Sequence, residues 1–275
     1  MTLPPEQIAL LASLRWQIAM GADEATLEQP VARAPRLEAT RVEVPRAAPP
    51  EVQQAARGAT PLRKPTPHGE AAAALAAGAN TLDELRAAMA EFTGSPLRET
   101  ATNLVFSDGV PGAPVMVIGE APGAEEDRLG KPFLDASGQL LDRMFASIGL
   151  NRAESLYITN ILPFRPPGNR KPTDAEIALF LPFVLRHIAL AKPRWLVLAG
   201  GVAAKGLLQS REGITRLRGR WHQVSILDGQ VLKAMPTLHP TYLLGNPAAK
   251  RDAWADLLML QREMNGGGIG AGGKP

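Results

Sequence analysis

Short apolar runs alternate with helical patterns along the second half of the chain, and this alternation constrains the fold more than any other feature. The runs VMVIG, SLYITNI, WLVLAG and VLKAMPTL occupy residues 115–119, 155–161, 195–200 and 231–238. Patterns with a helical period occupy residues 138–149, 174–191, 201–208 and 250–264, and Pro182 predicts a kink in the second of these. This order predicts an α/β fold with three layers, α/β/α, around a central, mainly parallel four-stranded sheet.

The N-terminal part of the chain has a different composition. Residues 1–28 show one helical apolar pattern. Residues 29–69 contain eight prolines, and carry six arginines and one lysine against three glutamates, with no sustained apolar period. We therefore expect an N-terminal helix (1–28), a disordered basic linker (29–69), a folded domain (70–265) and a flexible glycine-rich tail (266–275). Within the domain, a capping-box pattern predicts a further helix over residues 81–92.

Composition and charge restrict the classes of function. The chain of 275 residues has no cysteine, which excludes disulfides, thiolate metal sites and cysteine nucleophiles. Its formal net charge is +3, made up of −3 in residues 1–28, +4 in the linker and +2 in the remainder. A nucleic-acid surface on the folded part must therefore come from local placement of charge. No apolar run approaches the length of a membrane span, so we expect a cytoplasmic monomer without membrane contact, whose linker contacts DNA or a protein partner.

Four loops follow the carboxyl ends of the predicted strands, where ligands bind in parallel sheets. They read GEAPGAEED (119–127), NILPFRPPGNR (160–170), GGVAAK (200–205) and HPTYLLGNP (239–247). Taken singly, each has an ordinary structural explanation, such as a turn or a helix cap. The first is neither a dinucleotide fingerprint nor a phosphate loop, because GxGxxG does not fit and no Gly-Lys-Ser/Thr follows. Their joint occurrence at equivalent strand ends predicts one binding site.

The motifs GEAPGAEEDRLGKPFLDASGQLLDRM, YITNILPFRPPGNRKPT, LAGGVAAKGLL and HPTYLL resemble, in order and spacing, those of the uracil-DNA glycosylase superfamily, and most closely its family 4. The resemblance runs from about residue 92 to residue 260. It implies a base excision repair enzyme that acts on uracil-containing DNA, hydrolyses the N-glycosidic bond of uracil and leaves an abasic site. Such an enzyme rotates the target nucleotide out of the duplex into a pocket.

The resemblance implies a base pocket built from Phe133, Asn160 and His239. Phe133 would stack on the uracil ring. The Asn160 amide would accept from uracil N3–H and donate to O4, a pattern that cytosine inverts. His239 would donate a hydrogen bond to uracil O2 as negative charge develops there. Ala121 falls where the best-known family has an aspartate base, so we expect a modest rate.

Further residues are implicated in water activation and in DNA contact. Glu120 resembles the family residue beside the attacking water and Glu126 another acidic residue of the same site, and their division of roles stays open. Leu243 would fill the space that the flipped base leaves. The resemblance also suggests phosphate contacts through backbone N–H groups and cations, from Gly123, Gly138, Gly201, Arg165, Arg170, Lys250 and Arg251.

The chain departs from family 4 at its iron–sulfur cluster, which family members hold on four cysteines. The matching positions here are Phe92, Ser95, Phe164 and, less closely aligned, Leu179. None of these side chains ligates iron. We therefore predict that no cluster, other metal or other cofactor is bound, and that hydrophobic packing anchors the same loop.

Two alternatives stay open. The first is a non-catalytic or slow protein of the same fold that binds uracil or abasic sites in DNA, because the aspartate base and the cluster are missing. The second is an unrelated α/β nucleotide-processing enzyme, against which HPTYLL and GKPF argue. The superfamily variant that stays covalently attached to DNA has a His-containing insert after its Asn strand, and this chain has none there. The range of bases and the preference for single or double strands also stay open.

Overall fold

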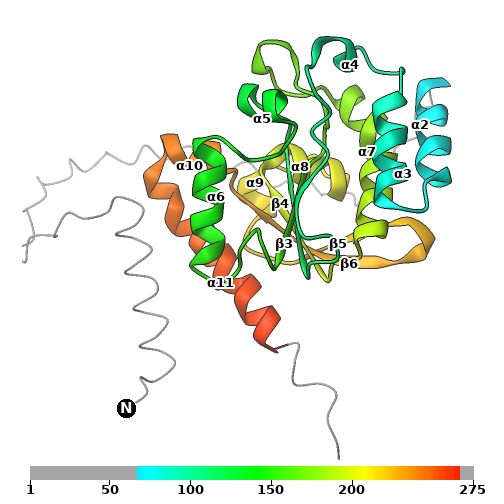
Figure 1. Cartoon of the computed structure of the whole chain (residues 1–275). Coiled ribbons are helices and arrows are strands. Elements are labelled where there is room, and N and C mark those ends of the chain that lie inside the picture. The colour runs from blue at the N-terminus through cyan, green and yellow to red at the C-terminus, as the bar shows by residue number, and fades with distance from the viewer. Residues whose placement is uncertain (1–66, 267–275) are drawn as a thin grey trace, which may run out of the picture. The chain divides into compact units, whose positions relative to one another are not determined.

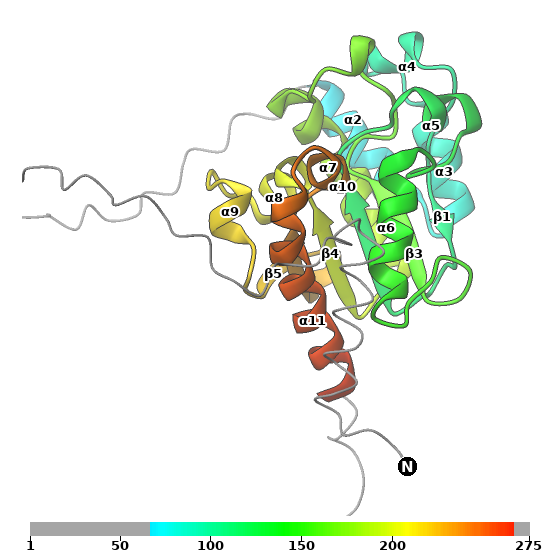
Figure 2. The ribbon, with the colours of Figure 1, turned by 90° about the vertical axis from the view of Figure 1, so that its left-hand side faces the viewer.

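A computed structural model describes residues 67–266 of the chain. The predicted helix over residues 1–28, most of the linker and most of the tail lie outside the described residues. Within the described part, a sheet lies between two layers of helices (Figures 1 and 2). No helix in this part is long and apolar enough to cross a membrane. The predicted three-layer α/β/α fold is confirmed.

The sheet has six strands in the order β1-β3-β2-β4-β6-β5. Their bounds are β1 (Asp108–Gly109), β2 (Val115–Gly119), β3 (Leu156–Asn160), β4 (Trp195–Ala199), β5 (His222–Ser225) and β6 (Val231–Thr237). All four predicted strands are present and form the parallel centre, but the predicted number of four was wrong. The two edge strands, β1 and β5, pair antiparallel with their neighbours. Neither carries the continuous apolar run of a strand buried on both faces, because β1 has only two residues and β5 is HQVS.

The strand register brings the four loops predicted to form the site to the same end of the sheet, the one at which the parallel strands end. Gly119 pairs with Asn160 across β2 and β3, and Ala199 pairs with Thr237 across β4 and β6. Because these strands are parallel, the residues that follow them leave the sheet at the same end. In Figure 1 this is the end at which α5 and α10 lie.

Helices cover both faces of the sheet. They are α2 (Pro67–Gly78), α3 (Leu82–Glu91), α4 (Leu97–Thr100), α5 (Ala124–Leu129), α6 (Ala136–Ala146), α7 (Asp174–Ala191), α8 (Gly201–Leu208), α9 (Ile214–Leu217), α10 (Pro240–Gly245) and α11 (Lys250–Gly266), with 3-10 turns η1 (Pro167–Asn169), η2 (Leu227–Gly229) and η3 (Pro247–Ala249). α6, α10 and α11 lie on one face, and α2, α3 and α7 lie on the other (Figures 1 and 2).

Most helix bounds follow from their caps. α7 begins after Thr173, whose hydroxyl accepts from the backbone N–H of Glu176, and the helix continues through Pro182. α6 begins at Ala136, two residues before the predicted start, because the Asp135 carboxylate accepts from the first free N–H groups. α2 begins at Pro67, so residues 67–69 belong to a helix and not to the predicted linker. Its alanine-rich sequence lacks the apolar stripe that would have indicated it.

Candidate active site

The three predicted base-pocket residues lie together at the carboxyl ends of β2, β3 and β6. The rings of Phe133 and His239 are stacked, with centroids 5.6 Å apart and planes inclined by 29°. Gly119 lies between Phe133 and Asn160. A Cβ atom on Gly119 would lie 2.4 Å from Asn160 Oδ1 and 2.5 Å from Phe133 Cζ, so this position has room only for glycine. Sequence reasoning did not single out Gly119, since its importance depends on two side chains distant in the chain.

Asn160 has an unpaired amide nitrogen. Its side chain is only 5% exposed at the end of β3. Among the described residues, Asn160 Nδ2 is the one buried side-chain nitrogen or oxygen with no hydrogen-bond partner. An unpaired buried donor costs about 1–3 kcal/mol, so buried polar groups are normally paired. The arrangement indicates that the amide is kept for a ligand that accepts a hydrogen bond.

His239 is a neutral hydrogen-bond donor at physiological pH. It caps α10, and its Nδ1 accepts from the backbone N–H of Thr241 at 3.2 Å. Because Nδ1 accepts there, the ring hydrogen of the neutral form is on Nε2. Burial lowers the pKa of His239 to about 4, although the Asp135 carboxylate acts against this shift. Gly200 packs against the ring with φ of +96°, and a Cβ there would lie 3.0 Å from His239 Cβ.

Glu120 follows β2 and is half-buried. Burial raises the pKa of its carboxyl group, and the nearby Lys171 ammonium partly offsets that effect. A carboxylate whose pKa is raised is a better proton acceptor, which is what a water-activating base requires. Its neighbour Ala121 is half-buried and packs against a cluster of buried aromatic side chains that includes Phe164 and Phe180. The structure therefore offers a carboxylate at Glu120 and an apolar surface at Ala121.

Glu126 has different surroundings from those expected of a residue that activates water. It is only 5% exposed, and both of its carboxylate oxygens accept hydrogen bonds from the backbone. Oε2 accepts from Gly123 N at 2.7 Å, and Oε1 accepts from Phe133 N. Burial raises the pKa of Glu126, and these backbone donors oppose that shift. Glu126 thus holds the two ends of the 123–133 loop in place.

Two of the three glycines predicted to bind phosphate have their N–H groups occupied. Gly123 N donates to Glu126, and Gly138 N donates to Asp135 Oδ1 at 3.1 Å. Gly138 is also buried, and a Cβ there would lie 1.9 Å from the carbonyl oxygen of Phe133. Neighbouring carboxylates therefore already accept from both of these N–H groups. Gly201 begins α8, whose N-cap residue offers no side-chain cap.

The predicted cations differ in their surroundings. Arg170 forms two hydrogen bonds with Glu176, at 2.9 and 2.6 Å, and this contact lowers the pKa of Glu176 to about 2. The charge of Arg170 is therefore paired with that of Glu176, and the Arg170 side chain is 45% exposed. Arg165 is half-buried and donates from Nε to Asn169 Oδ1 at 2.7 Å. Lys250 and Arg251 begin α11, and Arg251 is exposed.

Leu243 does not have the exposure that the predicted wedge requires. It is fully buried, whereas its neighbours Tyr242 and Leu244 on α10 are 51% and 43% exposed. HPTYLL folds into a helix, in which adjacent residues point about 100° apart, so Leu243 faces the core while Leu244 does not. The sequence did not indicate the rotational phase of so short a helix.

The positions matching the four cluster cysteines lie in or beside an aromatic core. The ring of Phe180 lies 6.0 Å from that of Phe92 and 5.9 Å from that of Phe164, in edge-on contacts. Leu179 packs against the same cluster, and Ser95 is buried and accepts from the backbone N–H of Leu97. No group of acidic or histidine side chains in residues 67–266 could hold a metal ion. These residues do not fit an iron–sulfur cluster, since no thiolate is present.

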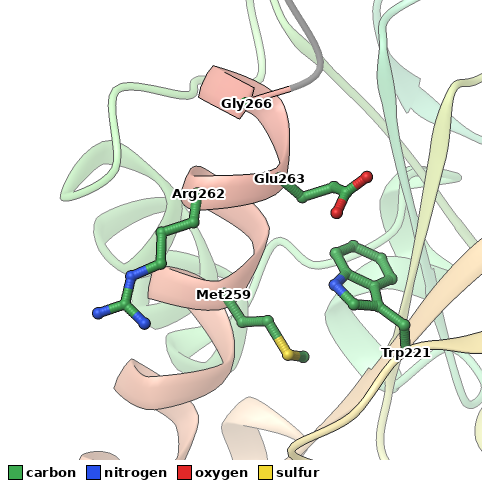
Figure 3. Close-up of a pocket in the computed structure, with 5 residues that line it drawn as sticks. All are labelled: Trp221, Met259, Arg262, Glu263 and Gly266. Atoms are coloured by element: carbon green, nitrogen blue, oxygen red, sulfur yellow. The ribbon is translucent and has the colours of Figure 1, made fainter.

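A surface pocket lies at the opposite end of the molecule, near the carboxyl end of α11. It is lined by Trp221, Met259, Arg262, Glu263 and Gly266 (Figure 3). Glu263 forms an ion pair with Lys233 of β6 at 2.5 Å. No predicted site residue lines this pocket, so we do not assign it to the base site.

Comparisons with known proteins indicate which family the chain belongs to. The sequence model of the uracil DNA glycosylase superfamily matches residues 106–258, which include Phe133, Asn160 and His239. A type-4 uracil-DNA glycosylase of Pyrobaculum aerophilum is 36% identical over 168 residues, which cover 60% of this chain and 85% of the relative. Those of Thermotoga maritima and Archaeoglobus fulgidus are 37% identical over 155 residues and 36% over 164. They cover 56% and 58% of this chain, and 78% and 81% of the relatives.

Proposed function

Because the chain belongs to the uracil DNA glycosylase superfamily, we propose that it is a uracil-DNA glycosylase, which hydrolyses the bond between uracil and the deoxyribose of DNA. The observation that carries this proposal is the unpaired, buried Nδ2 of Asn160 beside the stacked rings of Phe133 and His239. Each of these groups matches one requirement of uracil recognition: an apolar ring face, an amide for the pairing edge and a donor for O2.

The pocket distinguishes uracil from cytosine through Asn160. Its Nδ2 donates to uracil O4, and its Oδ1 accepts from N3–H. Cytosine presents an amino donor and an acceptor nitrogen at the same places, so both contacts would oppose like groups. Each buried group left unpaired costs about 1–3 kcal/mol. Two such groups give a discrimination of roughly 30-fold to 10⁴-fold.

Bond cleavage leaves the electron pair of the C1′–N1 bond on the uracil, largely at O2. The Nε2–H of neutral His239 stabilises this charge by a hydrogen bond. A water molecule then adds to C1′ of the cationic sugar through its oxygen and gives one of its two protons to the Glu120 carboxylate. Glu120 releases this proton to solvent and the uracil anion takes one up, so the products are uracil and an abasic site. Ala121 provides no carboxylate for this step, so electrostatic stabilisation by His239 carries much of the catalysis.

Contacts to DNA outside the pocket come from the same edge of the sheet. Leu244 takes the place of Leu243 as the apolar residue that fills the gap left by the flipped base, because Leu244 is the exposed leucine of α10. The N-terminus of α8 at Gly201, together with Arg251 and Lys250, faces phosphates. The basic segment 29–69 adds non-specific attraction to DNA.

The aromatic cluster of Phe92, Phe164 and Phe180 replaces the iron–sulfur cluster as the anchor of the loop after β3. In support, Phe164 follows Asn160 by four residues and is 3% exposed. Burying three such rings supplies packing energy without a metal. Purified protein should be colourless and free of iron, and an absorption band in the blue would contradict this assignment.

The function is tested with a labelled oligonucleotide containing one uracil, treated with alkali after incubation to cut abasic sites. We expect cleavage by the wild-type protein, a large loss in Asn160→Ala and His239→Ala, and no loss in Asn80→Ala, an exposed asparagine between α2 and α3. Wild-type activity retained in both pocket variants would show that the site is misassigned. No cleavage at large protein excess, with tight retention of abasic DNA, would favour the binding protein.

A further inference from the structure

Arg152 uses every donor of its guanidinium group. It lies in the turn between α6 and β3, with a side chain 17% exposed. Nη1 donates to Asp108 Oδ2 at 2.8 Å and to the carbonyl of Pro132 at 2.9 Å. Nη2 donates to the carbonyl of Phe133 at 2.8 Å and to Asp142 Oδ1 at 3.1 Å, and Nε donates to the same oxygen at 3.2 Å. These contacts account for all five N–H groups of an arginine.

The backbone that Arg152 contacts is strained. Phe133 has φ of +55°, in the left-handed region that a bulky residue rarely adopts. Such a conformation persists only where the surroundings impose it. The N–H of Phe133 donates to Glu126, and its carbonyl faces Arg152 and the backbone of Gly138. Arg152 therefore holds the carbonyl group of a residue whose N–H group is held by Glu126.

The backbone conformation of Phe133 determines where its ring lies. The far end of the ring, Cζ, is the atom that a Cβ on Gly119 would meet, beside the Asn160 amide. A small rotation about the Phe133 backbone moves Cζ more than any other atom of the ring. Misplacing a group that orients a substrate by about 1 Å can lower a rate by about 10²-fold.

We infer that Arg152 is a positioning residue of the reaction: by bonding the carbonyls of Pro132 and Phe133, it fixes the ring against which the flipped base stacks. This inference rests on the proposed glycosylase function. Arg152 does not lie at the base itself, and it acts through Phe133. Its hydrogen bond with Asp108 also joins this loop to β1, which pairs with β3, the strand that ends at Asn160.

Lysine cannot replace Arg152 in this arrangement. Its ammonium group has three donors at a single point, whereas the arginine fork places five N–H groups in one plane. The two carboxylates, on β1 and α6, orient the fork so that its remaining N–H groups face the two carbonyls. Although burial acts in the opposite direction, the hydrogen bonds from Arg152 and Lys131 hold the pKa of Asp108 below its ordinary value. Asp108 therefore stays ionised and keeps orienting Arg152 at neutral pH.

The test measures single-turnover excision of uracil and, separately, the Kd for DNA with an uncleavable uracil analogue. Arg152→Ala should lower the excision rate at least tenfold and change Kd less than threefold, and Arg152→Lys should restore only part of the rate. Arg186→Ala is the matched control, because Arg186 on α7 also donates to a backbone carbonyl, that of Ala79 at 2.7 Å, and is not among the partners of the Phe133 loop. It should retain the rate within threefold. An Arg152→Lys rate equal to that of the wild type would overturn the inference.

A double-mutant cycle with Phe133→Ala separates positioning from general stabilisation. If Arg152 acts through the ring, Arg152→Ala should change the rate less than twofold once the ring is gone. An equal loss in both backgrounds would show that Arg152 acts elsewhere. Should Arg152→Ala fail to fold in a thermal melt, Arg152→Lys takes its place in the cycle with the same criterion.

A wild-type protein without excision activity would refute the glycosylase function and this inference with it. An active wild-type protein whose Arg152 variants are unaffected would refute the inference alone.

Discussion

Replacing Asn160 with leucine should make the protein more stable and far less active. Leucine has the same branching at Cγ as asparagine but no amide, and its two methyl groups take up more room. The side chain is 5% exposed, and its Nδ2 is unpaired in the free protein. An unpaired buried donor costs about 1–3 kcal/mol, so its removal should raise the free energy of unfolding by up to this amount. For a domain of this size, a change of 1 kcal/mol corresponds to about 2–4 °C in Tm.

The loss of activity follows from the same contacts. In the variant, uracil N3–H and O4 enter the pocket without partners, at about 1–3 kcal/mol each. The value of kcat/KM should therefore fall roughly 30-fold to 10⁴-fold. Binding to DNA with an abasic site should change little, because that ligand has no base for Asn160 to contact. Melting curves and single-turnover excision on the same preparation give both quantities.

Asn103→Leu is the matched control for stability. The Nδ2 atom of Asn103 is paired, since it donates to the carbonyls of Asp127 at 2.7 Å and Arg128 at 3.1 Å. The same substitution there should lower Tm, because it leaves these carbonyls without their donor. A lower Tm for Asn160→Leu than for the wild type would refute the reasoning, since it would mean that the amide already contributes to stability without a ligand.

Three further predictions concern pH and helix α10. Burial raises the pKa of Glu120 and Lys171 lowers it, so Lys171→Met should move the acid limb of the pH–rate profile to higher pH. Burial holds the pKa of His187 at about 3, so this neutral ring contributes stability that is present above its unfolded pKa of about 6.5 and is lost as pH falls towards 3. In that pH window, His187→Gln should reduce the slope of the free energy of unfolding against pH by about 1.4 kcal/mol per pH unit. Urea unfolding at several pH values measures this slope. Leu244→Ala should slow excision from duplex DNA more than from single strands, whereas Leu243→Ala should cost about 2–5 kcal/mol of stability.

The outcomes that contradict these predictions are distinct. For Lys171, Lys205→Met on α8 is the control with the same change of charge, and an equal shift in both variants would indicate a general field effect. For His187, an unchanged slope between pH 4 and 6 would mean that the ring already titrates in the folded protein. For the helix, equal effects of Leu244→Ala on duplex and single-stranded substrates would exclude it as the wedge.

Features that depend on neighbours in the sequence were predicted well. Three of the central strands, β2, β3 and β4, are buried over their whole length and β6 over its second half, and the apolar runs that this burial requires are visible without a structure. The residues that end these strands share one edge of any parallel sheet. The resemblance to the glycosylase motifs assigned Phe133, Asn160 and His239 to one pocket, and the fold brings these three residues together at that edge.

The strand pattern, a local property of the sequence, was therefore enough to predict the parallel core and the edge of the sheet at which Phe133, Asn160 and His239 meet. The folded structure was needed to show which leucine of α10 is exposed, that Glu126 accepts from the backbone of its own loop, and that Arg152 reaches the carbonyl of Phe133. These features depend on helix phase and on hydrogen bonds between segments far apart in the chain. Neither composition nor spacing carries that information, because a donor and its acceptor can meet only after the chain has folded.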